Sequence, residues 1–257
     1  MSAKPETIRR LCSLKPRLEK RAAVFAAVRH FFCSKGFLEV DTPVRSPAPA
    51  PEPYINAIPS EAQFLRTSPE LEMKCMLASG YGRIFQIGPC FRKGEKGRLH
   101  SEEFTMLEWY EQGAGYLELI DFTRSLLVSV AEEVLGSGNC VFNGAGIDFG
   151  KAETITLESA FAKFAGKDLL EIVDGDLFEE TLVNEVEPFL PKDRPVFVRD
   201  YPAKFAALSR LKAADPRFAE RWELYLGGVE IANAYGELTD MKEQGRRFDE
   251  ARRRKNN

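Results

Sequence analysis

The sequence predicts an α+β fold in which an antiparallel β-sheet is flanked by helices. Two pairs of strand-like runs support this class: residues 83–92 with 103–111, and residues 222–226 with 229–235. Long segments of helical periodicity separate the pairs, and hairpins joined by helical excursions are typical of an antiparallel sheet with helices packed around it. At 257 residues and 44% hydrophobic content, the chain can bury the core of one main domain.

The N-terminal third predicts a tail, a helix, a short strand and a loop. Residues 1–17 are expected to form the tail, and the apolar stripe of residues 18–35 indicates an amphipathic helix that ends at Gly36. A short strand is expected at 37–40. The proline-rich run 43–53 is expected to be a long extended loop, because each proline removes a backbone donor and restricts the residue before it.

Further elements follow in order around the two hairpins. A capping serine, a proline at the first helical position and an acid in the first turn predict a helix from Ser68 to about Gly80. Residues 117–135 indicate a helix ended by a glycine-rich turn. Residues 156–191 alternate helical pattern with acidic turns, and residues 195–199 indicate a strand.

Composition narrows the class of protein. The net charge of −3 argues against a broad basic surface that grips nucleic acid backbone. No apolar run approaches membrane-spanning length and the N-terminus lacks a signal-peptide core, so we expect a cytoplasmic protein without a membrane partner. The five cysteines form no CxxC pair, and we expect them to be reduced and mostly buried.

Common catalytic and nucleotide signatures are absent. The sequence holds no GxxxxGK[ST] loop, and Gly144-Ala145-Gly146 is too short for a dinucleotide fingerprint. With His30 and His100 as the only histidines, a Ser/His/Asp triad or a histidine-rich metal site is not expected. Arginines and glutamates therefore remain as the candidates for chemistry.

The first hairpin offers one group of candidates. Period-two alternation places four side chains on one face, with Arg92 entering the loop from the partner strand. These four are Phe104, Met106, Glu108 and Tyr110. The loop between the strands is rich in glycine and basic residues, His100 included, a composition suited to closing over a polyphosphate. The alternative is a half-exposed sheet with a solvated loop.

The second hairpin offers a metal site. A two-residue Gly227-Gly228 turn would pair Glu223 with Ala232 and leave Glu223 and Glu230 as diagonal neighbours on one face. Two carboxylates there repel each other unless a cation lies between them. Mg²⁺ takes one or two carboxylates plus substrate phosphates, so the pair predicts a Mg²⁺–ATP site. The alternative is two exposed glutamates too far apart to share an ion.

Three further candidates lie just beyond this pair. Asn233, Tyr235 and Glu237 would fall on the opposite face of a regular strand. To join the same site they need a β-bulge, a feature common beside active sites.

Long, ordered motifs now indicate a family. Residues 21–43 resemble motif 1 of class II aminoacyl-tRNA synthetases, and residues 91–95 with 98–110 resemble motif 2. The run 227–240, GGVEIANAYGELTD, resembles the lysyl branch. The likeness covers most of the chain from Leu18 onward and implies that residues 18–257 form one catalytic domain of the class II synthetase core type.

Two features indicate a particular group within the lysyl branch. The seventeen or so residues before motif 1 leave no room for an anticodon-binding β-barrel, and TMLEWY at 105–110 is most similar to the elongation factor P–lysine ligase group. That resemblance implies ATP and Mg²⁺ as cofactors, lysine or β-lysine as substrate, elongation factor P as the acceptor partner, and tRNA as an unlikely one. The sequence leaves α-lysine and β-lysine undistinguished.

The resemblance also implies roles at the ATP end of the site. Arg92 would grip the substrate carboxylate and the α-phosphate, which makes it the catalytic candidate. Phe104 would stack on adenine, and His100 would lie near the phosphates. Glu223 and Glu230 would hold Mg²⁺. The attacking carboxylate is already ionised at neutral pH, so the rate would come from in-line positioning and neutralised phosphate charge rather than from a general base.

At the amino-acid end the resemblance implies a second set of contacts. Glu70 and Asn233 would meet the backbone-side amine, and Glu108 would line the floor of the pocket. Glu237 and the hydroxyl of Tyr110 would bind the side-chain ammonium, with Tyr235 completing the substrate pocket.

Three expectations stay open at this point. The glycine-rich third motif of class II enzymes is not found before Asn257, so the natural chain is either longer or a truncated, inactive copy. The alternative functions are a lysyl-tRNA synthetase-like enzyme acting on tRNA and an inactive paralogue that binds or regulates a partner. A homodimer is expected, because the family pairs subunits through motif 1 and the phenylalanines there are expected to exceed what one sheet can cover: Phe25, Phe31, Phe32 and Phe37.

Overall fold

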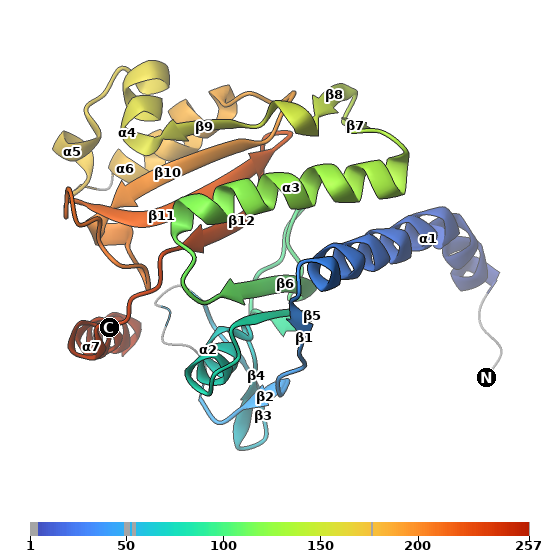
Figure 1. Cartoon of the computed structure of the whole chain (residues 1–257), viewed down its shortest axis with the longest axis horizontal. Helices are drawn as coiled ribbons and strands as arrows, with labels where there is room; N and C mark the ends of the chain where they lie inside the picture. The colour runs from blue at the N-terminus through green and yellow to red at the C-terminus, as the bar shows by residue number, and fades with distance from the viewer. Residues whose placement is uncertain (1–4, 49–51, 53–54, 176, 257) are drawn as a thin grey trace.

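A computed structural model describes residues 5–48, 52, 55–175 and 177–256 and has the α+β class expected (Figure 1). Its strands form two main sheets, ordered β1-β5-β6 and β12-β11-β10-β9, and two small ones, β2-β4-β3 and β7-β8. Most neighbours are antiparallel, but β1–β5 and β9–β10 are parallel. The strands are β1 Leu38–Glu39, β2 Arg45–Ser46, β3 Ile58–Ser60, β4 Gln63–Leu65, β5 Arg83–Phe91, β6 Glu103–Glu111, β7 Asn139–Phe142, β8 Ala145–Asp148, β9 Glu153–Thr156, β10 Val196–Pro202, β11 Phe218–Leu226 and β12 Val229–Tyr235.

Within the described ranges, seven α-helices surround the sheets, together with short 3₁₀ and π turns. The helices are α1 Pro5–Ser34, α2 Glu70–Ala78, α3 Tyr116–Leu135, α4 Leu157–Ala160, α5 Leu169–Ile172, α6 Leu177–Thr181 and α7 Met241–Asn256. The short turns are Phe149–Lys151, Phe161–Ala165, Leu182–Val186, Glu187–Phe189 and Ala203–Phe205. The alternation of helical pattern and turns expected for residues 156–191 is therefore confirmed.

Two predicted boundaries in the N-terminal third need correction. The first helix begins at Pro5 rather than at Leu18, so residues 5–17 are helical and not an irregular tail. Its end is as expected, because Gly36 has a φ of 75°, which favours glycine. Part of the proline-rich loop lies outside the described residues, and Arg45–Ser46 within it forms a short strand.

The second helix begins one residue later than expected. Pro69 precedes α2, which starts at Glu70, and the amide of Glu70 donates to Oγ of Ser68 at 3.2 Å. The serine thus stabilises the start of the helix, as the sequence indicated. This start places Glu70 in the first turn of α2 and buries it.

An aromatic cluster joins α1 and α3 to the first sheet. Phe32 stacks on Phe85 with ring centroids 4.6 Å apart. Phe31, Phe37 and Phe122 pack into the same core. The reason given for a dimer is therefore wrong for three of the four phenylalanines, since Phe31, Phe32 and Phe37 are buried within their own chain. Stacked and edge-to-face aromatic pairs explain why one sheet can cover so many rings.

The same helix α3 also packs against the second sheet. Tyr116, at its start, accepts a 2.8 Å hydrogen bond from the indole of Trp222 through its carbonyl oxygen. Phe197 meets Trp222 edge-to-face at 5.3 Å. One long helix therefore contacts both sheets and sets the two hairpins in a common frame (Figure 1).

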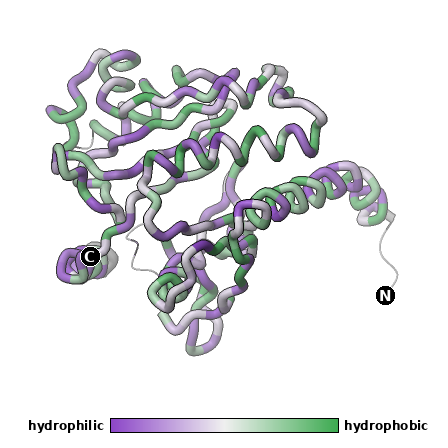
Figure 2. The backbone as a smooth tube through the Cα atoms, in the orientation of Figure 1, coloured by the Kyte–Doolittle hydropathy of each residue, from purple (hydrophilic) through white to green (hydrophobic). Residues whose placement is uncertain are grey.

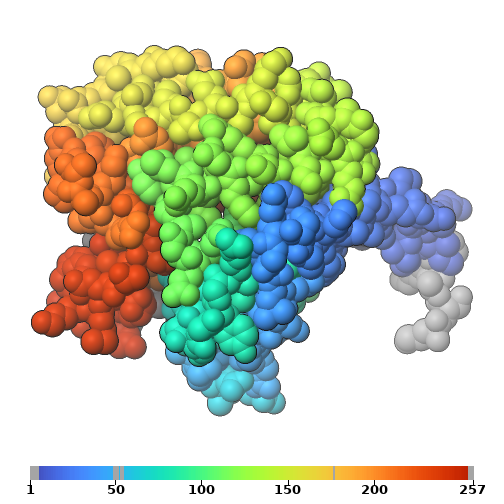
Figure 3. All heavy atoms as spheres, in the orientation of Figure 1, coloured from blue at the N-terminus to red at the C-terminus, as the bar shows by residue number. Residues whose placement is uncertain are grey.

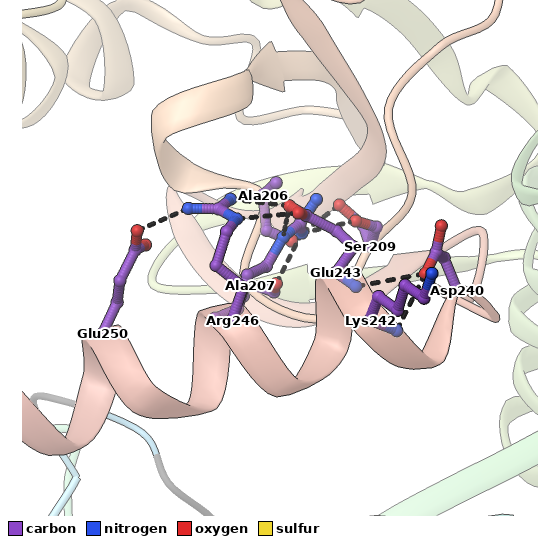
Figure 4. Close-up of polar contacts among 9 residues, drawn as sticks. Ala206, Ala207, Ser209, Asp240, Lys242, Glu243, Arg246 and Glu250 are labelled. Atoms are coloured by element: carbon purple, nitrogen blue, oxygen red, sulfur yellow. Dashed lines mark hydrogen bonds and ion pairs between the residues drawn. The ribbon is translucent and has the colours of Figure 1, made fainter.

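The last helix anchors the segment that follows the second hairpin (Figure 4). Asp240 caps α7 by accepting from the amides of Lys242 at 2.9 Å and Glu243 at 3.1 Å. Arg247 donates to the carbonyl oxygens of Ala207 and Ser209 at 2.7 and 2.8 Å. The helix is largely hydrophilic along its length (Figure 2), as expected for a solvated basic helix.

The remaining observations concern the surface. The N-terminal part of α1 projects beyond the rest of the molecule (Figure 3). Among the described residues, no helix is both long and apolar enough to cross a membrane. All five cysteines are free, but Cys12, Cys33 and Cys75 are exposed, so the expectation that most are buried is wrong.

Candidate active site

The second hairpin turns where the sequence indicated, but its register changes. Gly227 and Gly228 have φ values of 61° and 79°, as a type I′ turn requires, and Leu226 pairs with Val229. Beyond Tyr225 and Glu230, which are paired, the register shifts by one residue.

That shift is the β-bulge on which the prediction depended. Leu224 pairs with Ala232, which leaves Ile231 as the extra residue. Glu223 therefore faces Asn233 rather than Ala232, and the predicted pairing of Glu223 is corrected.

The bulge decides which side chains share a face. Paired residues lie on the same side of a sheet, and alternate residues of a strand do too. Because Glu223 pairs with Asn233 and Arg221 with Tyr235, the bulge brings Asn233 and Tyr235 to the face that carries Glu223 and Glu230. The predicted bulge is confirmed, and one face gathers candidates for both ends of the site.

Glu223 lies in a dense set of hydrogen bonds. It is buried and accepts from the hydroxyl of Tyr201 at 2.6 Å, the hydroxyl of Tyr225 at 2.9 Å and the guanidinium of Arg221 at 2.6 Å. Both tyrosine bonds use Oε2, and the arginine uses Oε1. A carboxylate oxygen accepts about two hydrogen bonds, so Oε1 keeps a free lone pair.

Glu230 is more accessible to solvent than Glu223, and the negative charge of Glu223 repels its carboxylate. Loss of solvent and then the charge of Glu223 raise the pKa of Glu230 to about 7. Arg92, on the other hairpin, lies close enough that its charge opposes this rise. A carboxyl group whose pKa is raised beside a second carboxylate suits a cation. In the described part of the chain, no cluster of three or more acidic, histidine or cysteine side chains could hold a metal alone.

The first hairpin has the register that its alternation predicted. Phe104 pairs with Cys90, Glu108 with Gln86, and the strand bounds agree to within one residue. Tyr110 donates to Oε2 of Glu108 at 3.0 Å, which shows that these alternate residues share a face. The intervening Trp109 packs on the opposite side, in the aromatic core.

Arg92 and Phe104 are brought together at the end of this hairpin. The amide of Arg92 donates to the carbonyl oxygen of Glu102 at 2.9 Å, which continues the ladder by one pair. The guanidinium carbon lies 5.2 Å from the ring centroid of Phe104. Nε of Arg92 is buried and makes no hydrogen bond to the described residues. His100 is exposed on the loop, so its place beside the phosphates stays a prediction.

The amino-acid end combines residues from distant parts of the chain. Lys74, one turn after Glu70 on α2, lies 2.6 Å from Oε1 of Glu70 and 2.5 Å from Oε2 of Glu237. Tyr235 donates to Oε2 of Glu70 at 3.0 Å. Lys74 was not among the site residues predicted from the sequence. Its signal was the spacing of four residues from Glu70, which places the two side chains on one helix face.

Burial controls the charges in this pocket. It raises the pKa of Glu108 to about 8, with the charge of Glu70 adding to the effect. It raises the pKa of Glu237 to about 7, against the opposing charge of Lys74. Burial alone would lower the pKa of Lys74, but Glu70 and Glu237 raise it above its usual value. Three carboxyl groups thus surround one ammonium group, which favours a ligand that brings further positive charge.

The pocket is also lined by tyrosines held in their neutral form. Burial and the surrounding carboxylates raise the pKa of Tyr110 and Tyr235 well above the usual value. The hydroxyls therefore remain hydrogen-bond donors and acceptors across the physiological range. Two surface hollows of about 320 and 500 Å³ lie along α3, and no candidate residue lines either.

The structure divides the candidates into two neighbouring groups. The amino-acid end holds Glu70, Glu108, Tyr110, Tyr235 and Glu237. The ATP end holds Arg92, Phe104, Glu223 and Glu230. Asn233, opposite Glu223 on the strand that carries Glu230 and Tyr235, lies between them.

The fold and the site indicate a class of protein, and comparison with known proteins confirms that class. The sequence profile of the family "tRNA synthetases class II (D, K and N)" matches residues 8–257. The chain belongs to this family, and its class of enzyme is that of the ATP-dependent ligases.

Individual relatives are named as ligases. An "Elongation factor P--(R)-beta-lysine ligase" of Enterobacter sp. (strain 638) is 38% identical over 261 residues, which cover 93% of this chain and 79% of that protein. Another of that name, from Yersinia pestis (strain Pestoides F), is 37% identical over 257 residues, which cover 92% and 78%.

Proposed function

We propose that this enzyme uses ATP to activate lysine or β-lysine as an aminoacyl-adenylate and then transfers the aminoacyl group to a lysine of elongation factor P. The observation that carries the proposal is that α2 and the two hairpins bring their candidate side chains together. An arginine and an aromatic ring at one end adjoin a pocket of carboxylates and tyrosines at the other. The names of the relatives support the acceptor.

The amino-acid end accounts for the choice of a diamino acid. Glu70 is the partner of one amine, together with Asn233. Glu237 and the Tyr110 hydroxyl are the partners of the other, and Glu108 and Tyr235 complete the walls. Acids with pKa values raised by burial gain most from a cation, since the cation replaces lost solvation.

The ATP end accounts for the chemistry. Arg92 holds the substrate carboxylate beside the α-phosphate, and its buried Nε, which makes no hydrogen bond to the described residues, supplies a donor for this contact. A carboxylate oxygen attacks the α-phosphorus, the new O–P bond forms, and pyrophosphate leaves. The acceptor amine then attacks the adenylate carbonyl and AMP leaves. Phe104 provides the stacking face for adenine.

Glu223 and Glu230 are the proposed Mg²⁺ ligands. Both supply the oxygen donors that Mg²⁺ prefers, and Glu230 is the more accessible of the two. Two carboxylates make a weak magnesium site, so the phosphates of ATP must complete the shell. The ion would neutralise phosphate charge as pyrophosphate departs.

We place the reaction in the cytoplasm, the compartment of translation, where both ATP and elongation factor P are present. We further propose that tRNA is not an acceptor and that the enzyme is a homodimer. Pyrophosphate exchange with α-lysine and β-lysine tests the activation step. Transfer of radiolabelled lysine to purified elongation factor P or to tRNA tests the acceptor. Labelling of tRNA alone would contradict the proposed acceptor, and no exchange with either isomer would contradict the activity.

A further inference from the structure

Lys74 joins two parts of the chain that the amino-acid pocket needs in fixed positions. Glu70 lies on α2, whereas Glu237 follows β12 at the other end of the chain. The ammonium of Lys74 contacts both carboxylates, at 2.6 and 2.5 Å. Its side chain is 19% exposed, against 10% for Glu70 and 30% for Glu237, so the contacts are poorly screened by solvent.

The contacts leave hydrogen-bond acceptor positions on both acids unused by Lys74. Lys74 uses Oε1 of Glu70 and Oε2 of Glu237. The other oxygen of Glu70 accepts from Tyr235, and a carboxylate offers about four acceptor positions in all. An incoming ammonium group can therefore bind each acid without displacing Lys74.

Removing the bridging cation would leave the two acids facing each other. Lys74 is the cation that contacts Glu70 and Glu237, while Glu108, Tyr110 and Tyr235 also face this group. Two poorly solvated carboxylates in one pocket cannot both stay ionised at low cost. One would take up a proton, and a neutral acid binds an ammonium group weakly.

We propose that Lys74 is a positioning residue that holds Glu70 and Glu237 at a fixed separation and offsets their mutual repulsion, so that each accepts one ammonium group of the diamino acid. The inference rests on the proposed function and goes beyond it by assigning specificity to a residue that does not touch the reacting atoms. It explains why a pocket for a cationic substrate contains a lysine of its own.

The test is calorimetric binding of lysine and of ATP to the full chain, measured from pH 6 to pH 9 for wild type, Lys74→Met, Lys74→Arg and a control. The control is Lys163→Met, the same chemical change at an exposed lysine. At pH 7 we expect lysine to bind Lys74→Met roughly tenfold or more weakly, because a poorly solvated charge has lost its partner, with ATP affinity unchanged. Lys74→Arg, which keeps the charge, should recover part of the lysine affinity.

The pH profile separates positioning from a merely structural role. In wild type, lysine affinity should rise as pH increases through the pKa of Glu237. In Lys74→Met this rise should move to higher pH, because Lys74 no longer favours the ionised acid. Lys163→Met should match wild type in affinity and profile.

Three outcomes in Lys74→Met would overturn the proposal. They are unchanged lysine affinity, tighter lysine binding, and a pH profile of lysine affinity that is the same as in wild type. Tighter binding would mean that Lys74 competes with the substrate. Should Lys74→Met fail to fold, as judged by circular dichroism, the arginine variant decides. Its altered geometry should weaken lysine binding while ATP binds normally, and wild-type lysine affinity there would contradict the proposal. Absence of lysine binding in wild type would instead contradict the proposed function.

Discussion

The hydroxyl of Tyr235 donates a 3.0 Å hydrogen bond to the carboxylate of Glu70, although the two residues are 165 positions apart. This contact connects the first turn of α2 with the end of the second hairpin. Lys74 adds a second connection between the same segments. The amino-acid pocket therefore exists only when both halves of the chain are folded together.

Exchange of Glu237 for glutamine is expected to weaken activation of lysine. Glu237→Gln keeps the shape and removes the charge that pairs with a cation in a poorly solvated pocket. Loss of such a pair usually costs about 2–5 kcal/mol, so kcat/KM for lysine should fall on the order of thirtyfold or more, with ATP binding near normal. Pyrophosphate exchange at varied lysine concentration measures the change.

The structure supplies a control for this variant. Asp240, not Glu237, caps the following helix. Asp240→Ala should therefore lower the melting temperature, since a lost cap costs about 1 kcal/mol, and leave lysine activation intact. Full exchange activity in Glu237→Gln would rule out its role in the lysine pocket.

Exchange of Glu230 for glutamine is expected to weaken Mg²⁺-dependent binding of ATP. One of two proposed ligands loses its charge, so activation should fall on the order of tenfold or more. Calorimetry with Mg²⁺ alone, ATP alone and both together measures the change, and wild type should bind the ion only with ATP. Glu179→Gln, at an exposed acid on α6, is the matched control. Unchanged activation in Glu230→Gln would contradict the metal site.

Stability should fall as pH rises through the range in which Glu108 ionises. Its pKa is about 8 in the folded chain, against an ordinary value of 4.5, so the folded state binds the proton more tightly. The stabilisation that the folded chain gains by keeping Glu108 protonated is fully present below pH 4.5. It is lost progressively as the pH rises to 8. Part of the group is hydrated, so we expect a loss of about 1–2 kcal/mol between pH 6 and pH 8.

Urea unfolding at several pH values measures this loss. Glu108→Gln cannot ionise, so its stability should vary less with pH over the same range. Glu179→Gln should keep the wild-type slope. An identical slope in Glu108→Gln and wild type would show that the acid is not held protonated.

A homodimer is expected from the exposed apolar side chains of α1, since three of the four phenylalanines are buried within their own chain. Ile8, Leu11 and Leu18 are 51%, 56% and 54% exposed on a helix that projects from the body. Light scattering at micromolar concentration should give twice the chain mass. Leu18→Glu should shift the mass toward a monomer, whereas Leu177→Glu, at a similarly exposed leucine on α6, should not. A monomeric wild type would contradict the expectation.

Local pattern determined much of the fold. The strands of the first hairpin were predicted to within one residue, because alternation and flanking glycines act over a few positions. The Gly227-Gly228 turn was predicted from the residue type, because glycine readily adopts the positive φ values that the structure shows there. The need for a bulge after Glu230 also followed, since period-two alternation alone kept Asn233 and Tyr235 on the wrong face.

Other features depended on tertiary packing. No local signal decided which residue would form the bulge, and the shift at Ile231 changed the partner of Glu223. The burial of Phe31, Phe32 and Phe37 depended on Phe85 and Phe122, which lie far along the chain.

Lys74 shows the same limit at the site itself. Its spacing from Glu70 was visible in the sequence, but its contact with Glu237 arises only when α2 and the end of β12 pack together. The raised pKa values of Glu108 and Glu237 have the same origin, because desolvation depends on every segment that covers a group. Sequence determined which acids and tyrosines were available, and packing decided which of them share one poorly solvated pocket.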